Sequence, residues 1–132
     1  TVLRMAGIFG PGRLLRRISD LQAQKPLPGD SDQWLNLIHV QDAVRMIDFV
    51  SSADAVPSVI NVVNSDTVTR RQYYSRLADL VSAPAPVFET SNTSARQRGG
   101  NKRVVSRYRQ DLNVAFEFDD VLTGLKQAVD AG

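Results

Sequence analysis

Apolar and polar positions change their spacing several times along this chain, and each change marks a predicted element. A short apolar run over 2–5 leads into a stretch rich in glycine and proline over 6–12. From 13 to 24 the apolar residues recur at helical spacing, which leaves the charged residues between them in solvent. We therefore expect a strand, a loop and a helix, the crossover unit that usually lies within a parallel sheet.

Beyond this unit, the same pattern predicts two more such units and a looser tail. Thr69 and Gln72 have the spacing of a capping box, and Ser106 and Asp119 are the expected caps of two later helices. In chain order the further predicted elements are a loop over 25–32, a strand over 34–40, a helix over 42–50, a strand over 58–63 buried on both faces, a helix over 69–81, a loop over 89–100, a short helix over 106–112, an extended segment over 114–118 and a last helix over 119–129. The fold class is therefore α/β with mostly parallel strands, organised as one unit over 1–132.

The position of the first unit is informative, because only Thr1 precedes it. Such units normally have strands on both sides, so we expect the chain to form the later part of a larger domain. Its strands are expected to pair with a second copy of the chain or with the missing N-terminal half.

Composition narrows the function classes only a little. The chain has 132 residues, of which 42% are hydrophobic, enough for one modest core. It has no cysteine, which excludes disulfides and thiolate chemistry and is compatible with a cytoplasmic location. The formal net charge of +2 does not argue for nucleic acid. No apolar run approaches the roughly 20 residues of a membrane span, and no signal peptide is recognisable.

Four segments, taken together and in this order, resemble the C-terminal portion of the NAD-dependent epimerase/dehydratase family, the extended short-chain dehydrogenase/reductases. The segments are Leu3-Arg4-Met5-Ala6-Gly7-Ile8-Phe9-Gly10-Pro11-Gly12-Arg13, Asn36-Leu37-Ile38-His39-Val40-Gln41-Asp42-Ala43, Val59-Ile60-Asn61-Val62-Val63 and Asn101-Lys102-Arg103-Val104. The last segment is most similar to nucleoside-diphosphate-sugar-epimerase-like members. The resemblance implies a partial Rossmann-like fold, the substrate-binding part of an enzyme that uses NAD or NADP.

Two features of that family are missing from this chain. No Gly-x-x-Gly-x-x-Gly loop is present to hold the cofactor pyrophosphate, and Pro11 removes a donor from the one glycine-rich turn. The family's Tyr-x-x-x-Lys pair is also absent, since none of the three tyrosines is followed by lysine at that spacing. The chain alone is therefore expected to be inactive, to contain no catalytic residue and to bind neither NAD nor NADP.

The resemblance also assigns site residues at the carboxyl ends of the strands. It places Ala6, Gly7 and Ile8 beside the nicotinamide, and Phe9, Arg13, Asn101, Lys102 and Arg103 around a small-molecule substrate. Where nucleotide-sugar members have asparagine this chain has Gly7, which a tight turn would also explain. Where they have a phosphate-binding arginine it has Leu35, so a small hydroxylated or sugar-like substrate is expected instead.

Other candidate residues have mainly structural interpretations. His39 is the one histidine, and with no cysteine it predicts a core or capping role and no metal site. Arg4 is expected to pair with Asp42 or Asp48. The basic run over 96–109 is compatible with solvated surface, with the lining of a substrate cleft or with nucleic acid. The competing function is a non-catalytic binding module derived from such an enzyme.

Overall fold

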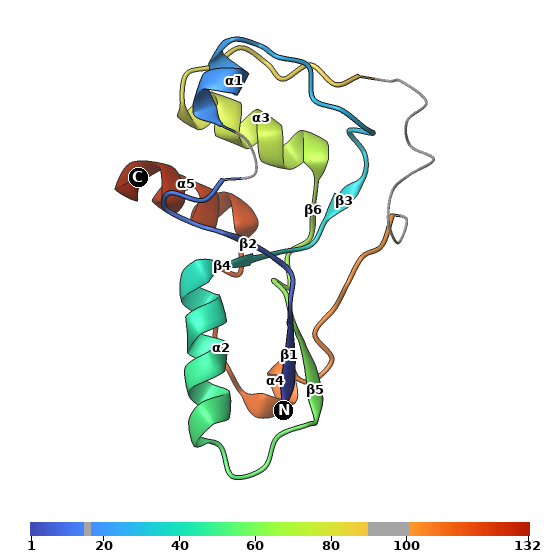
Figure 1. Cartoon of the computed structure of the whole chain (residues 1–132), viewed down its shortest axis with the longest axis vertical. Helices are drawn as coiled ribbons and strands as arrows, with labels where there is room; N and C mark the ends of the chain where they lie inside the picture. Colours follow the sequence, from blue (N-terminus) through green and yellow to red (C-terminus); the bar gives the residue numbers. More distant parts are fainter. Residues whose placement is uncertain (15–16, 90–100) are drawn as a thin grey trace.

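The computed structural model describes residues 1–14, 17–89 and 101–132. Figure 1 shows an elongated molecule, with β1, β5 and α2 at one end, α1 and α3 at the other, and β2 and β4 between them. In chain order the elements are β1 (Val2–Met5), β2 (Gly7–Phe9), α1 (Ile18–Gln22), β3 (Trp34–Leu35), β4 (Leu37–His39), α2 (Val40–Ser52), β5 (Val59–Val62), β6 (Val68–Thr69), α3 (Arg70–Leu80), α4 (Arg109–Leu112) and α5 (Val121–Ala131).

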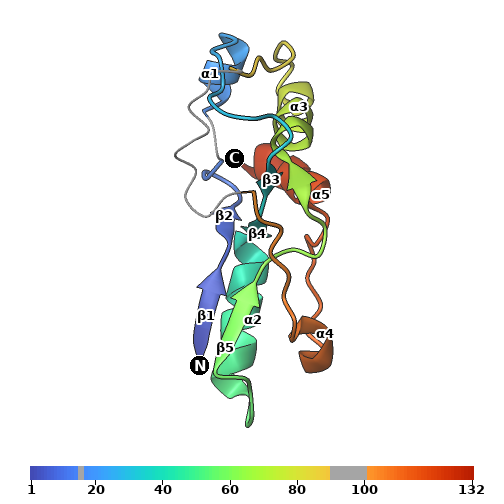
Figure 2. The ribbon, with the colours of Figure 1, turned by 90° about the vertical axis from the view of Figure 1, so that its right-hand side faces the viewer.

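The strands form three short pairs, of which two are parallel. β1 lies parallel to β5, from Val2 opposite Val59 to Met5 opposite Val62. β2 lies parallel to β4, and β3 pairs with β6 in the antiparallel sense. Figure 2 shows β1 and β2 following one another as the chain leaves its N-terminus. The expected α/β architecture with mostly parallel strands is confirmed.

Two expectations about strands are wrong. The segment after β1 is not a loop throughout, because Gly7–Phe9 forms β2. The strand expected over 34–40 is two strands, β3 and β4, with Asn36 between them. In both cases hydrogen bonds to a distant partner decide the outcome, and apolar spacing does not reveal that partner.

The observed helix boundaries agree best with the predicted ones where the sequence contains a recognisable capping residue. Thr69 caps α3 through the predicted capping box, in which Gln72 returns the bond to the cap backbone. The last helix is capped by Asp120, whereas the neighbouring Asp119 binds other groups. Ser106 does not cap α4, since its buried hydroxyl has no hydrogen-bond partner. Helix α1 is only five residues long and begins at Ile18, later than predicted.

Two further expectations are corrected in the same part of the chain. Residues 114–118 form no strand; Glu117 and Phe118 lie in a turn whose backbone N–H groups donate to the Asp42 carboxylate, at 2.8 Å each. Asp42 is fully buried and so is unavailable to Arg4, which is exposed. A buried carboxylate thus ties α2 to the turn before α5.

The apolar residues gather in two clusters. The upper cluster joins α1, α3 and α5 to the ends of β2 and β4, with Phe9, Tyr73, Leu77 and Leu125 fully buried. The lower cluster is aliphatic and lies where α2 covers the β1–β5 pair, with Met46 among its fully buried residues. The expectation that β5 is buried on both faces is half right, since buried and half-buried positions alternate along it.

Candidate functional site

The candidate site begins where β1 passes into β2. The Ala6 N–H donates to the Val62 carbonyl and the Gly7 N–H to the Asn36 carbonyl, at 3.0 Å each. A Cβ added to Gly7 would lie 3.1 Å from the Leu37 side chain and 3.3 Å from the Asn36 carbonyl oxygen. Because both N–H groups are already used, this junction cannot hold a pyrophosphate. Gly7 itself is exposed at this junction.

Asn36 fastens a distant segment beside this junction. Residues 101–104, here called the strap, run past the start of β4. The Asn36 amide donates to the Lys102 carbonyl at 2.9 Å, and its Oδ1 accepts from the Val104 N–H at 2.7 Å. Both polar ends of one side chain are therefore used to hold the strap. The strap thus reaches Gly7 through a single residue that bonds to both.

The strap has a second attachment at β3. Asn101 Oδ1 accepts from the Trp34 N–H at 2.8 Å, and the Arg103 guanidinium lies 5.2 Å from the centre of the Trp34 ring. Lys102 and Arg103 are exposed. The arrangement leaves two cations and an aromatic face at the edge of the strap, where an oxygen-rich ligand would find donors.

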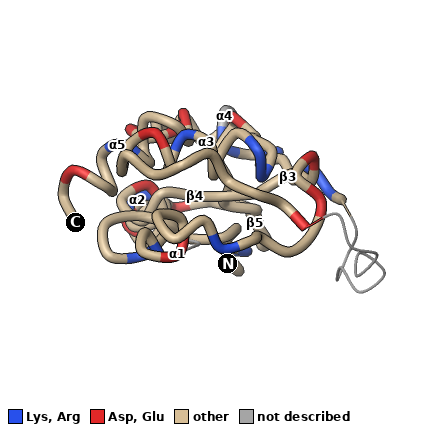
Figure 3. Tube along the Cα trace, turned by 90° about the horizontal axis from the view of Figure 1, so that it is seen from above, with Lys and Arg blue, Asp and Glu red and all other residues tan. Residues whose placement is uncertain are grey.

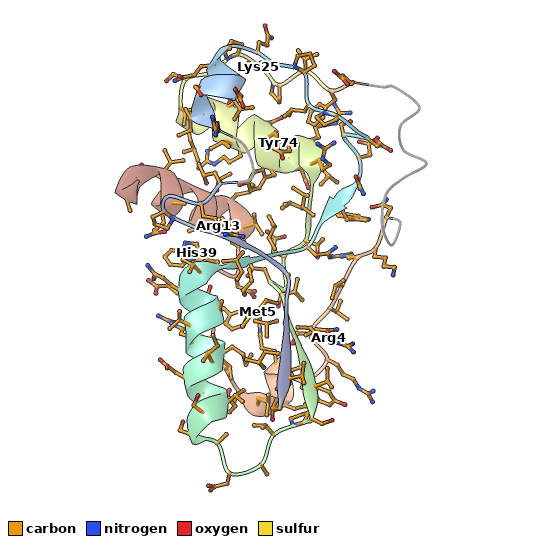
Figure 4. All side chains as sticks on the ribbon, in the orientation of Figure 1. Arg4, Met5, Arg13, Lys25, His39 and Tyr74 are labelled. Carbon is orange, nitrogen blue, oxygen red and sulfur yellow. The ribbon has the colours of Figure 1, made fainter. Side chains whose placement is uncertain are left out.

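Arg13 is positioned by a tight turn. Gly10 and Arg13 exchange backbone hydrogen bonds at 3.0 and 2.9 Å around Pro11 and Gly12, with φ of 74° at Gly12. Proline followed by a positive-φ glycine is the pattern of a type II turn. The turn brings the Arg13 Nε to the Ile8 carbonyl at 3.1 Å. In Figure 4 Arg13 lies beside β2 and α5, apart from the strap.

Phe9 and His39 belong to the core. Phe9 has no exposed surface, so the expectation that it contacts a substrate is wrong: its ring meets His39 and Tyr73 edge-on. His39 is fully buried and caps α2, accepting from the Gln41 N–H at 3.2 Å, while its Nε2 lies 2.8 Å from Oε1 of Gln127. An accepting Nδ1 assigns the ring proton to Nε2.

Three carboxylates surround the start of α5, and their pKa values differ. Burial and the nearby Asp120 raise the pKa of Asp66. Burial acts most strongly on Asp119, yet the hydrogen bonds from Arg109 and the Ser65 N–H outweigh it and lower the pKa. The hydrogen bond from Thr123 leads the effects that lower the pKa of Asp120.

The remaining surface gives few indications of chemistry. Along the described trace, Figure 3 shows basic and acidic positions interspersed rather than gathered on a face of one sign. Within residues 1–14, 17–89 and 101–132, no cluster of three or more His, Cys, Asp or Glu residues suits a metal ion. No helix of this part is long and apolar enough to span a bilayer. The expected loop over 89–100, with Arg96 and Arg98, lies largely outside the described residues.

Comparison with solved structures shows that this chain shares the fold of the corresponding part of proteins described as epimerases. Human epimerase family protein SDR39U1 with NADPH superposes with a TM-score of 0.82 at 19% identity, over 98% of this chain and 48% of that one. UDP-glucuronic acid 4-epimerase from Bacillus cereus, solved with UDP-glucuronic acid and NAD, gives 0.75 at 19%, over 99% and 44%.

Two other proteins match this chain at higher sequence identity. Protein YeeZ of Escherichia coli K12 is 28% identical over 123 residues, 92% of this chain and 42% of YeeZ. A functionally unknown conserved protein from Silicibacter pomeroyi is 27% identical with a TM-score of 0.79, over 98% and 48%. No family model matches the chain. The chain spans less than half the length of the relatives it matches.

Sequence reasoning located the strap but missed what holds it. Asn36 lies within the second segment that resembles the family, and neither the resemblance nor the apolar pattern gives it a role. Its signal was weak: a polar residue that interrupts an apolar run is equally typical of a solvent-facing strand position. For Trp34 the apolar pattern likewise predicts only a strand position, and not its contacts with Asn101 and Arg103.

Proposed function

We propose that this chain is the substrate-side portion of an NAD(P)-dependent epimerase- or dehydratase-like protein. Its substrate is a small hydroxylated or sugar-like molecule, held where the strap lies beside Gly7. The observation that carries the proposal is the double hydrogen bond from Asn36 to the strap, next to the backbone bond that Asn36 receives from Gly7.

Of the NAD or NADP cofactor, only the nicotinamide end would lie against this chain. Ala6, Gly7 and Ile8 would flank the nicotinamide with backbone and small apolar groups, and the cofactor would supply hydride transfer. The pyrophosphate must be bound elsewhere in the protein, because the N–H groups of Ala6 and Gly7 are taken. The chain's own part is to bind and orient substrate oxygens through Lys102 and Arg103. We place the protein in the cytoplasm, because a chain without cysteine has no disulfide that this reducing compartment could break.

Nuclear magnetic resonance on the labelled chain tests this assignment. A panel of small polyols, sugars and hydroxy acids is expected to shift the amides of Gly7 and of Lys102–Val104. Asn36→Ala should abolish those shifts, while Arg71→Ala, an exposed residue of α3, should leave them unchanged. Shifts confined to other regions, or unaffected by Asn36→Ala, would refute it. Calorimetry should show no micromolar binding of NAD or NADP to the chain alone.

A second candidate function, a binding module, is favoured by one observation. Among the described residues β1 pairs with β5 alone, and Val2, Val44 and Ile47 are 57%, 50% and 46% exposed at this end of the molecule. An open strand edge with apolar neighbours pairs readily with another chain. Self-association or a second polypeptide would cover it.

Light scattering distinguishes the two candidates. If the open edge and α2 form an interface, the chain should associate at high concentration, and the double variant Val44→Lys/Ile47→Lys should return it to a monomer. Val87→Lys, a similarly exposed valine elsewhere, is the matched control. A wild-type chain that stays monomeric with a cooperative melt would exclude self-association.

A further inference from the structure

A small polar pocket opens at the carboxyl end of β5, next to the candidate site but lined by none of the residues assigned to it. Residues 63–65 form one wall, and residues 105–107 with Arg109 form the other. Its volume is about 260 Å³. Figure 2 shows the chain that follows the strap running alongside β5 toward α4, which is how residues far apart in sequence come to share this pocket.

Asn64 presents an unused acceptor at this pocket. The residue is 2% exposed, its N–H donates to the Leu37 carbonyl at 2.8 Å, and its Nδ2 donates to the Phe118 carbonyl at 2.9 Å. These bonds fix which end of the amide is oxygen. Oδ1 is buried and accepts from no group in the described structure. A buried carbonyl oxygen without a donor is unfavourable, so a ligand that supplies a donor would be stabilised there.

Ser106 presents a second unused group on the opposite wall. Its Oγ is buried and makes no hydrogen bond with the described residues. A hydroxyl both donates and accepts, whereas the Asn64 oxygen only accepts. One ligand hydroxyl would satisfy both groups at once, by donating to Asn64 and accepting from Ser106. A group that only accepts, such as a fully ionised phosphate, would leave Asn64 unpaired.

The charge of the pocket comes from Arg107. Arg109 is already engaged, with Nη1 and Nη2 at 2.7 and 2.9 Å from the two carboxylate oxygens of Asp119. Arg107 is exposed, lies 5.6 Å from the centre of the Tyr108 ring and forms no ion pair with the described residues. An exposed guanidinium beside two buried hydroxyl-binding groups suits a ligand with an anionic end and a hydroxyl end.

We propose that this pocket binds a small hydroxylated anion, a hydroxy acid or a phosphorylated polyol, with its hydroxyl between Asn64 and Ser106 and its anionic group on Arg107. The proposal does not depend on the function proposed above, because none of these residues holds Gly7 or the strap. Ser106 and Arg107 lie on a segment without helix or strand.

Calorimetry on the full chain tests this site with four probes. Glycerol 3-phosphate and glycerate carry both the hydroxyl and the anion, and their relative affinities distinguish phosphate from carboxylate. Glycerol and inorganic phosphate each lack one half and should bind much more weakly. Ser106→Ala should weaken binding about 3- to 10-fold, as expected for one neutral hydrogen bond. Arg107→Gln should weaken it about 10-fold or more, as expected for a charged one.

Arg71→Gln is the matched control, since it removes the same charge from an exposed position of α3, outside both the pocket and the candidate site. It should leave binding unchanged. Ser106→Ala also reports on the pocket without a ligand: removing an unpaired buried hydroxyl should leave the melting temperature unchanged or raised. The proposal would be overturned if inorganic phosphate bound as well as glycerol 3-phosphate, if Arg71→Gln and Arg107→Gln gave equal losses, or if neither two-part probe showed saturable binding.

Discussion

The two apolar clusters of this molecule are closed to different degrees. Ten buried residues form the upper cluster, with eight partly buried ones against them. In the lower cluster five buried residues are accompanied by nine partly buried ones. The upper cluster is enclosed by α1, α3 and α5, whereas α2 covers the lower one from one side and the β1 edge stays open. Among the described residues, the upper core is therefore enclosed more completely than the lower one.

The largest expected effect separates the clusters directly. Leu125→Ala removes a fully buried side chain from α5, and Met46→Ala does the same in α2. We expect losses of about 3–4 kcal/mol for Leu125→Ala and about 2 kcal/mol for Met46→Ala, because a half-exposed surround relaxes more easily around a cavity. Urea denaturation measures both. Equal losses would show that the lower cluster is as tightly packed as the upper one.

A second substitution tests the link between the regions. Asp42→Asn would replace one carboxylate oxygen with a donor that faces a backbone N–H of the 117–118 turn. We expect it to lower the free energy of unfolding by about 2–4 kcal/mol, because a buried N–H loses its acceptor. The exposed Asp48→Asn, in the same helix, should change it by less than about 0.5 kcal/mol. Similar effects of the two variants would count against a structural role for Asp42.

Much of the fold could be predicted where local chemistry decides it. The capping box at Thr69 and the apolar spacing of α2 and α5 gave those helices directly. β2 and β6 could not be predicted, because two- and three-residue strands exist only through their partners. The contact between Asp42 and the 117–118 turn could not be predicted either. A carboxylate in the first turn of a predicted helix is typical of an exposed residue, and nothing in the local sequence indicates that it accepts hydrogen bonds from a distant turn.

The candidate site shows the same limit. Gly7, Asn101, Lys102 and Arg103 could be nominated from the resemblance, and they do lie near one another. Phe9 could not be told from a ligand-facing aromatic, because burial depends on helices that arrive far later in the chain. The hydrogen bonds of Asn36 join positions more than sixty residues apart, a separation that no local pattern encodes.

A smaller effect is expected from releasing the strap. Asn36→Ala removes both hydrogen bonds to the strap while leaving the backbone bond from Gly7 in place. We expect a loss of about 1–2 kcal/mol, together with much faster hydrogen exchange at Val104. Exchange at β5, measured in the same experiment, should change little. Unaltered exchange at Val104 would mean that other contacts hold the strap.

The smallest expected effects come from the carboxylates near α5. Asp119 and Asp120 have lowered pKa values, so their stabilisation is present above the ordinary carboxyl pKa and is lost as the pH falls. Asp66 has a raised pKa, so its ionisation works against folding as the pH rises past its ordinary value. Asp66→Asn should therefore stabilise the chain at neutral pH, by less than about 0.5 kcal/mol. Thermal melts between pH 3 and pH 7 test the sign: a destabilised Asp66→Asn at neutral pH would contradict it.

The bond between Asp42 and Phe118 also bears on how the chain is made. It joins residues 76 positions apart, and the upper cluster needs Val121 and Leu125 from α5 before it can close. During synthesis, α3 must therefore emerge with part of its apolar face uncovered and stay so until α5 has left the ribosome. The lower cluster draws its members from residues 3–116 alone, so the two cores become complete at different moments of translation.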